Sequence, residues 1–114
     1  MERLYVVTRQ DLPDGPQAVQ SCHAVVAFAI EHRECLERWA MGSNTLVLVS
    51  VRNEDELRSL ASSAEDAGIL TSRFHEPDLG GSLTSVVMDP RAKRLCRSLP
   101  KTLHGRAEDS LKHP

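Results

Sequence analysis

The pattern of apolar positions divides this chain into short strands separated by longer amphipathic stretches. Continuous apolar runs over residues 3–9 and 45–51 are typical of strands that are covered on both faces. Weaker runs predict a third strand over residues 69–74 and a fourth over residues 83–88. Because only the short loop 76–81 separates the last two strands, we expect them to pair antiparallel.

Apolar residues at helical spacing fill the intervals between these strands. A first helix is expected to start near Pro16, since proline is favoured in the first turn of a helix. A second helix is predicted over residues 34–41, and a third opens at the cap residue Asn53 and stops at Gly68. A short basic helix runs from Pro90 through residue 97. The apolar stripe of the first helix consists of Val19, Cys22, Val26, Ala29 and Ile30.

The predicted order of elements is β-α-(α)-β-α-β-β-α. Helices of this length between strands imply parallel crossovers with helices on both faces of the sheet. The expected fold class is therefore α/β, a three-layer α/β/α sandwich with a mixed four-stranded sheet. From residue 102 onward the chain is polar and has no apolar period, so we expect one domain over residues 1–101 and a loose tail over residues 102–114.

Composition narrows the class of protein. A chain of 114 residues that is 40% hydrophobic can form one domain with a modest core. No apolar run approaches the roughly 20 residues that span a bilayer, and the first residues lack the features of a signal peptide. The 3 cysteines are odd in number and scattered, which favours reduced thiols over a disulfide framework. We therefore expect a cytoplasmic protein with no membrane partner.

The charge pattern leaves two interpretations open. The net charge of −2 gives no global electrostatic reason to bind nucleic acid. Between residues 89 and 106, however, six cations stand against a single anion, which indicates either a solvated helix face or a contact with a polyanion such as RNA. These cations are Arg91, Lys93, Arg94, Arg97, Lys101 and Arg106.

Several kinds of site can be set aside. His32 and Cys35 are three residues apart, but zinc needs two further ligands and no CxxC or HxxxH motif supplies them. Cys22 and His23 are adjacent, so on a helix they point about 100° apart and cannot pair. The chain has no nucleophile elbow, Walker loop or GxGxxG motif. We expect no metal site and no cofactor.

Polar residues at two strand ends and one helix start provide the remaining candidate chemistry. Arg9 and Asp11 follow the first strand, while Gln20 and His23 share a face of the first helix. A lone helix histidine is more often structural, and the residues Glu76-Pro77-Asp78 can be an ordinary turn. If these segments converge with Thr84, an imidazole or carboxylate could activate water while hydroxyl or amide donors hold an oxyanion. That set would hydrolyse an ester.

At these residues the chain resembles the type-2 peptidyl-tRNA hydrolase family. The resemblance rests on Val6-Val7-x-Arg9-x-Asp11-Leu12…Gly15…Gln20-x-x-His23-Ala24, and on Gly81-Ser82-x-Thr84 with Pro90 after the last strand. It covers roughly residues 3 to 98. It implies the three-layer sandwich, a homodimer, and hydrolysis of the ester that joins a peptide to the 3′ ribose of tRNA, without metal or cofactor.

The resemblance also implies roles for individual residues. His23, Asp11, Gln20 and Thr84 match family positions, and the nearest carboxylate to the family's aspartate before the final loop is Glu76 or Asp78. The expected catalytic set is therefore His23, Glu76, Asp78, Thr84 and Asp11. The expected substrate-binding set is Arg9, Gln20, Ser82, Arg91 and Arg94.

The chain departs from the family pattern at the turn after the first strand. Where the family has Lys-x-Gly-Lys-Gly-Lys, this chain has Pro13-Asp14-Gly15-Pro16-Gln17 and no lysine. A lysine there would contact phosphate or stabilise negative charge in the transition state. Two alternatives therefore stand beside the hydrolase: a non-catalytic domain of the family that binds RNA or a protein partner, and a small-molecule regulatory module that shares only the layered architecture.

Overall fold

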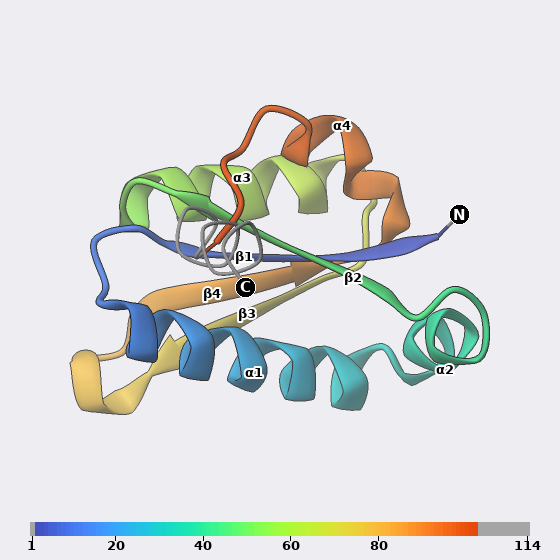
Figure 1. The fold of residues 1–114 in the computed structure, drawn as a ribbon, viewed down its shortest axis with the longest axis horizontal. Helices are drawn as coiled ribbons and strands as arrows, with labels where there is room; N and C mark the ends of the chain where they lie inside the picture. The colour runs from blue at the N-terminus through green and yellow to red at the C-terminus, as the bar shows by residue number, and fades with distance from the viewer. Residues whose placement is uncertain (1, 103–114) are drawn as a thin grey trace, which may run out of the picture.

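One four-stranded sheet forms the middle of the molecule in the computed structural model, which describes residues 2–102 (Figure 1). Its strands are β1 (Arg3–Arg9), β2 (Thr45–Val51), β3 (Thr71–Glu76) and β4 (Ser82–Met88). The strand order is β2-β1-β4-β3, so β1 and β4 are central and the other two are edges. β1 pairs parallel with β2, whereas β4 pairs antiparallel with both β1 and β3. The expected antiparallel pair and the mixed sheet are confirmed.

Helices cover both faces of this sheet (Figure 1). They are α1 (Asp14–Glu31), α2 (Arg33–Met41), α3 (Glu54–Asp66) and α4 (Lys93–Cys96), with 3-10 turns η1 (Pro77–Leu79) and η2 (Pro90–Ala92). α1 and α2 lie on one face, and α3 and α4 lie on the other. The three-layer α/β/α sandwich is therefore confirmed. None of the helices within residues 2–102 is long and apolar enough to cross a bilayer.

Several element boundaries differ from the prediction for local reasons. α1 begins at Asp14 rather than near Pro16, because the N–H of Gln17 already bonds to the carbonyl of Pro13 at 2.9 Å. The third strand runs over residues 71–76 instead of 69–74, since the N–H of Ile69 is used to close α3 on Ala64. The predicted basic helix is a 3-10 turn followed by a single α-helical turn that ends at Cys96.

The ends of α3 follow their capping residues. The side chain of Asn53 accepts a hydrogen bond of 3.0 Å from the N–H of Glu56, as a helix N-cap should. Gly68 adopts the left-handed conformation with φ of +77°, which ends the helix where predicted. α3 is thereby held at both ends.

The core lies in two apolar clusters, one on each face of the sheet. Successive residues of β1 alternate between them: Leu4 and Val6 face the side of α1, and Tyr5 and Val7 face the side of α3. Both clusters continue onto the central strand β4, where Val87 joins the first and Val86 the second. The two central strands are thus buried on both faces, as their continuous apolar sequences predict.

The orientation of α1 is a surprise. An apolar stripe on a helix normally marks its buried face, yet Val19, Val26 and Ile30 are 53%, 57% and 77% exposed. The face that packs on the sheet is largely polar, and its polar groups are hydrogen-bonded, so the usual cost of burying them is offset. The buried residues of α1 are Gln17, Gln20, Ser21, Ala24 and Phe28.

The segment after α4 returns to the free edge of β2. The N–H of Ser50 donates to the carbonyl of Pro100 at 2.8 Å, and the N–H of Thr102 donates to the carbonyl of Leu48 at 3.0 Å. The chain is therefore held as far as Thr102. The division into a domain over residues 1–101 and a loose tail remains a prediction, because the tail lies otherwise outside the described residues.

Candidate active site

A β-bulge in the central strand β4 directs one of the predicted residues toward α1. Phe74 pairs with Ser85 and the next residue, His75, pairs with Leu83, so Thr84 is an extra residue without a partner on β3. Bulges re-aim side chains and are common beside active sites. Thr84 therefore faces the same side of the sheet as α1.

Gln20 links this bulge to the end of β3. The hydroxyl of Thr84 donates to Gln20 Oε1 at 2.6 Å, and Gln20 Nε2 donates to Glu76 Oε1 at 2.9 Å. The reverse orientation of the amide would set its oxygen against the carboxylate, so the two bonds together determine which way the amide faces. Both Gln20 and Thr84 are buried, and this places them behind Glu76 as positioning residues.

Glu76 is the carboxylate that the structure brings into the network. The hydrogen bond from Gln20 lowers the pKa of Glu76; burial opposes this effect, while the N–H of Asp78 and the positive charge of His23 add to it. Glu76 is therefore anionic at neutral pH. Ser82 lies directly opposite Glu76 in the β3–β4 register, which puts its side chain on the same face of the sheet.

Asp78, the other candidate carboxylate, occupies a different position. It is exposed in η1, and its contact with Glu76 is made by its backbone N–H, 3.4 Å from Glu76 Oε2. The left-handed Gly80 and Gly81 then turn the chain into β4. Asp78 thus shapes the loop next to the network without its carboxylate entering it.

His23 lies next to this network and is open to solvent. Its imidazole stacks on the ring of Phe74, with centroids 4.7 Å apart and planes inclined by 13°. His23 lies one helical turn from Gln20 on α1, and Phe74 lies two residues from Glu76 on β3. Each of the two stacked rings is therefore close to a residue of the network. The stacking holds an exposed imidazole in one orientation near a carboxylate.

Arg9 and Asp11 form a two-point ion pair at the end of β1. Arg9 Nε and Nη2 donate to the two carboxylate oxygens of Asp11, each at 2.9 Å, and Arg9 Nη1 donates to the carbonyl of Leu83 at 3.2 Å. The hydrogen bond from Arg9 lowers the pKa of Asp11. This pair braces the beginning of β4, one residue before Thr84.

Two predicted substrate-binding residues, Arg91 and Arg94, lie elsewhere. They follow the last residue of β4, whereas the network is built on its first residues, and α4 is at the other end of the molecule in Figure 1. Arg91 is paired with Asp89, with Nη2 and Oδ2 2.6 Å apart. The structure does not bring these two cations to the Gln20–Glu76 network.

The His32 and Cys35 pair considered for a metal has other contacts. His32 Nε2 lies 3.2 Å from the carbonyl of Thr71, and Cys35 is the buried residue of α2, in the core cluster on that face of the sheet. Over the part of the chain that the structure describes, no three His, Cys, Asp or Glu side chains are grouped to hold a metal ion.

Sequence reasoning missed two supporting residues. Phe74 stacks on His23, but the sequence predicts only a weak strand around it. Thr8 is fully buried, and its hydroxyl donates to the carbonyl of Thr84 at 2.9 Å, which supports the bulge. A hydroxyl residue within an otherwise apolar strand was the available signal for Thr8, whereas the role of Phe74 depends on pairing that the sequence does not state.

The arrangement suits proton transfer to and from water. An imidazole is the commonest general base in enzymes, and an anionic carboxylate near it stabilises the imidazolium that forms when it takes a proton. The buried threonine and glutamine hold that carboxylate in place.

A protein-family model described as "Peptidyl-tRNA hydrolase PTH2" matches residues 3–105 of the chain.

Proposed function

The chain belongs to the peptidyl-tRNA hydrolase PTH2 family, and on that premise we propose that it hydrolyses the ester between a peptide and tRNA. The observation that carries the proposal is the chain of hydrogen bonds from Thr84 through Gln20 to Glu76, next to the exposed His23. His23 supplies a proton acceptor and Glu76 a positioned anion, and both residues lie within the region that the family model matches.

In the proposed reaction His23 acts as the general base. A water oxygen attacks the ester carbonyl as its proton passes to the imidazole, and Glu76 stabilises the imidazolium. The bond between the carbonyl carbon of the peptide and the 3′ oxygen of the ribose then breaks, and this oxygen takes the proton back from His23. The Ser82 hydroxyl, opposite Glu76 in the strand register, is our candidate donor to the oxyanion. Gln20 and Thr84 act through Glu76, and Asp11 acts through Arg9.

Hydrolysis of a labelled acetyl-aminoacyl-tRNA by the purified protein tests this function. His23→Ala should lower kcat by about 10²–10⁴-fold, the usual contribution of a general base. His75→Ala is the matched control, because His75 is also an exposed histidine but pairs with Leu83, which faces the side of α3. Glu76→Gln should lower kcat strongly and Asp78→Asn only slightly. Activity that is unchanged by both His23→Ala and Glu76→Gln would sink the site.

The same experiment separates the alternative functions. Absence of hydrolysis, with RNA binding that weakens steeply with salt, would indicate a non-catalytic RNA-binding member of the family. Absence of both would point to a protein partner or a small ligand. RNA binding should be measured beside hydrolysis because the Pro13–Gln17 turn lacks the lysines that would contact phosphate.

We also propose that the protein works as a homodimer. The exposed apolar stripe of α1 runs beside the edge strand β2, and between them lies a groove of about 380 Å³. Its lining contains no charged side chain, so the groove offers no ion pair to a charged partner. A second copy would cover apolar surface with apolar surface, as homodimer interfaces do. The lining residues are Val6, Ala18, Ser21, Cys22, Val25, Val26, Leu46 and Leu48.

The cytoplasm is the proposed site of action. The substrate class is found where translation takes place. Cys22, Cys35 and Cys96 are all free thiols, which agrees with a reducing compartment.

A further inference from the structure

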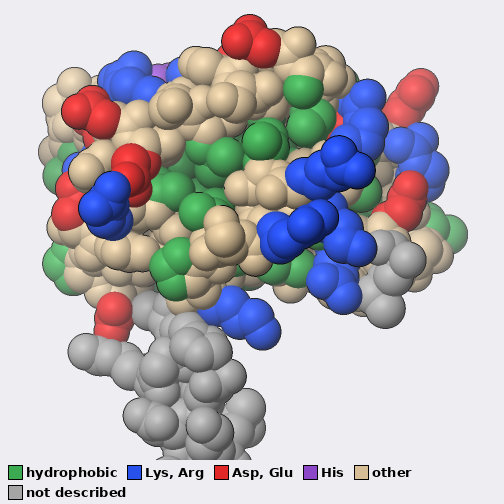
Figure 2. All heavy atoms as spheres, turned by 90° about the horizontal axis from the view of Figure 1, so that it is seen from above, with side chains coloured by type: hydrophobic (Ala, Val, Ile, Leu, Met, Phe, Trp, Pro, Cys, Tyr) green, Lys and Arg blue, Asp and Glu red, His purple; other side chains and the backbone are tan. Residues whose placement is uncertain are grey.

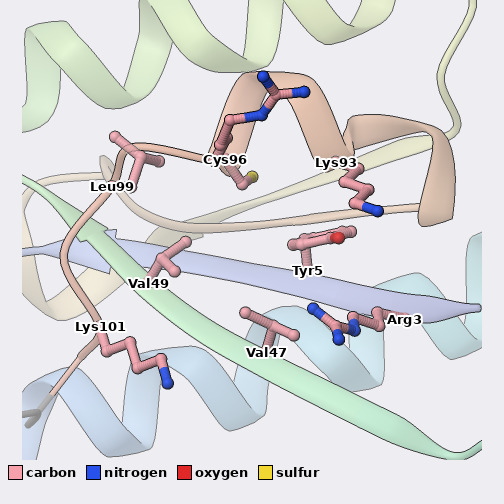
Figure 3. Close-up of a pocket in the computed structure, with 9 residues that line it drawn as sticks. Arg3, Tyr5, Val47, Val49, Lys93, Cys96, Leu99 and Lys101 are labelled. Carbon is pink, nitrogen blue, oxygen red and sulfur yellow. The ribbon is translucent and has the colours of Figure 1, made fainter. Parts of the chain in front are cut away.

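A second hollow lies on the other face of the sheet, between the β1–β2 edge and α4 (Figure 3). It has a volume of about 230 Å³. The side chains that line it come from the first residues of β1, from β2, from α4 and from the segment that returns to β2. It therefore lies under α4, whereas the Gln20–Glu76 network lies under α1.

Cations surround this hollow without a compensating anion. Arg3, Lys93, Arg97 and Lys101 all line it, and no carboxylate does. None of the four joins an ion pair with another described residue. Figure 2 shows Lys and Arg side chains gathered at one end of the face that α3 and α4 cover. In a protein of net charge −2, this is a local site for an anion rather than a general basic surface.

The floor of the hollow is apolar but carries one hydroxyl. Tyr5 is 5% exposed, and Val47, Val49 and Leu99 lie around it. Within residues 2–102 the Tyr5 hydroxyl makes no hydrogen bond to protein, and Figure 3 shows it on the side of Lys93. The hydroxyl is not among the buried unpaired polar atoms, so it is accessible from the hollow that Tyr5 lines. A ligand oxygen placed among the cations can therefore accept its hydrogen bond.

We propose that this hollow, which we call the Tyr5 pocket, binds the phosphate and ring of a nucleotide. Two arginines and two lysines match the charge and hydrogen bonding of phosphate. Inorganic phosphate would leave the apolar floor uncovered, whereas a ring would cover it. The volume of about 230 Å³ exceeds the roughly 150 Å³ that holds a benzene ring in an engineered cavity.

The nucleotide can come from two sources that share this chemistry. It can be free, or it can be one residue of an RNA strand. The RNA source rests on the proposed function, because a tRNA substrate would then contact the protein on both faces of the sheet. The free source is independent of it. Binding can be measured without hydrolysis, so failure of one proposal does not imply failure of the other.

Calorimetric titration with ADP, inorganic phosphate and a short unstructured RNA tests the Tyr5 pocket. The pocket variant is Lys93→Gln with Arg97→Gln. Its matched control is Arg33→Gln with Arg52→Gln, which removes the same charge from exposed positions outside the pocket. The pocket variant should weaken binding by about tenfold or more, and the control by less than about twofold. Tyr5→Phe, which keeps the ring in the core, should weaken it by about threefold.

Each outcome decides the proposal. Binding of ADP that is lost in the pocket variant supports a free nucleotide, and RNA binding alone with the same loss supports the RNA source. Amide NMR shifts confined to residues 93–101 on adding the ligand would locate the site. The proposal is overturned if neither ADP nor RNA binds, if the pocket and control variants weaken binding alike, or if inorganic phosphate binds as tightly as ADP.

Discussion

The hydroxyl of Thr84 donates a hydrogen bond of 2.6 Å to Gln20 Oε1, so a residue of the sheet determines the orientation of a helix amide. With its oxygen engaged, the amide must present its nitrogen to Glu76. The position of the proposed catalytic carboxylate is thereby set by two buried residues that lie 64 positions apart in the chain.

Replacing Thr84 by valine should damage both stability and activity. Valine keeps the shape but leaves Gln20 Oε1 buried without a donor, which costs about 1–3 kcal/mol in the free energy of unfolding. The amide is then free to turn, so kcat should fall while KM changes little. Urea unfolding and steady-state hydrolysis measure the two effects. Thr84→Ser, which restores the donor, should recover most of kcat; a purely structural role would show no such recovery.

The pKa of Glu76 should depend on Gln20. The hydrogen bond from Gln20 is the main cause of its lowered pKa, so Gln20→Leu should raise that pKa toward the ordinary glutamate value. Carbon-13 NMR titration of the Glu76 carboxyl reads this directly. Glu56 on α3, whose pKa is lowered chiefly by its hydrogen bond from Arg52, is an internal reference that should not move. An unchanged Glu76 titration would contradict the proposed network.

Adding a lysine to the lysine-free turn should raise activity on tRNA. Gly15 is exposed, and a side chain at this position would meet no atom within 4 Å. Gly15→Lys adds a phosphate contact, so kcat/KM should rise by about tenfold at low salt. The slope of log(kcat/KM) against log salt concentration should become more negative by about 0.9, the value for one phosphate contact. Gly15→Gln is the control for size and helix propensity. Equal rates for the two variants would show that the turn does not approach the substrate.

Asp89 should stabilise the fold in a pH-dependent way. Burial alone would raise its pKa, but hydrogen bonds from the Arg91 side chain and from the N–H groups of Arg91 and Leu70 lower it overall. A carboxyl whose pKa is lowered on folding stabilises the protein above its unfolded pKa, and this contribution is lost as pH falls through the folded value. Asp89→Asn should therefore cost about 2 kcal/mol near pH 7.

The difference between wild type and Asp89→Asn should shrink as the pH falls below the ordinary aspartate range. Urea unfolding at a series of pH values measures it. Asp66→Asn, at an exposed position near the end of α3, is the control variant measured alongside. A gap that does not change with pH would contradict the linkage.

Charging the exposed stripe of α1 should dissociate the proposed dimer. Val26→Asp places a carboxylate in the apolar groove, where a second copy would have to desolvate it. Light scattering after size exclusion should report a dimer for the wild type and a monomer for the variant. Met41→Asp is the control, since Met41 is 88% exposed on α2 and does not line the groove. A monomeric wild type would rule the dimer out.

The layered fold could be predicted from the chain because its signals are local. The apolar run Thr45–Val51 and the Asn53 cap each depend on neighbouring residues, and both elements were found where expected. Which face of α1 packs on the sheet could not be predicted in this way. Its polar face is buried because Gln20 and Gln17 find partners in distant segments or turns, and such partners are absent from the helix sequence itself.

The candidate site was predicted in part for the same reason. His23, Gln20, Thr84 and Glu76 were all singled out, and the structure places them together. The choice between Glu76 and Asp78 required knowing that β3 extends to residue 76. Substrate binding by Arg91 and Arg94 stays a prediction, and the structure places both residues after the last residue of β4, away from the network.

The bulge at Thr84 makes the proposed active site sensitive to the number of residues in β4. Leu83 and Val86 lie in the same core cluster although they are three residues apart, an odd spacing that ordinary alternation forbids. Deleting one residue here would place Leu83 two residues from Val86, so ordinary alternation would keep Leu83 in its cluster, but the bulge that sets Thr84 against Gln20 would be lost. The core packing of Leu83 and Val86 alone would accept a strand one residue shorter, so the extra residue of β4 serves the placement of Thr84.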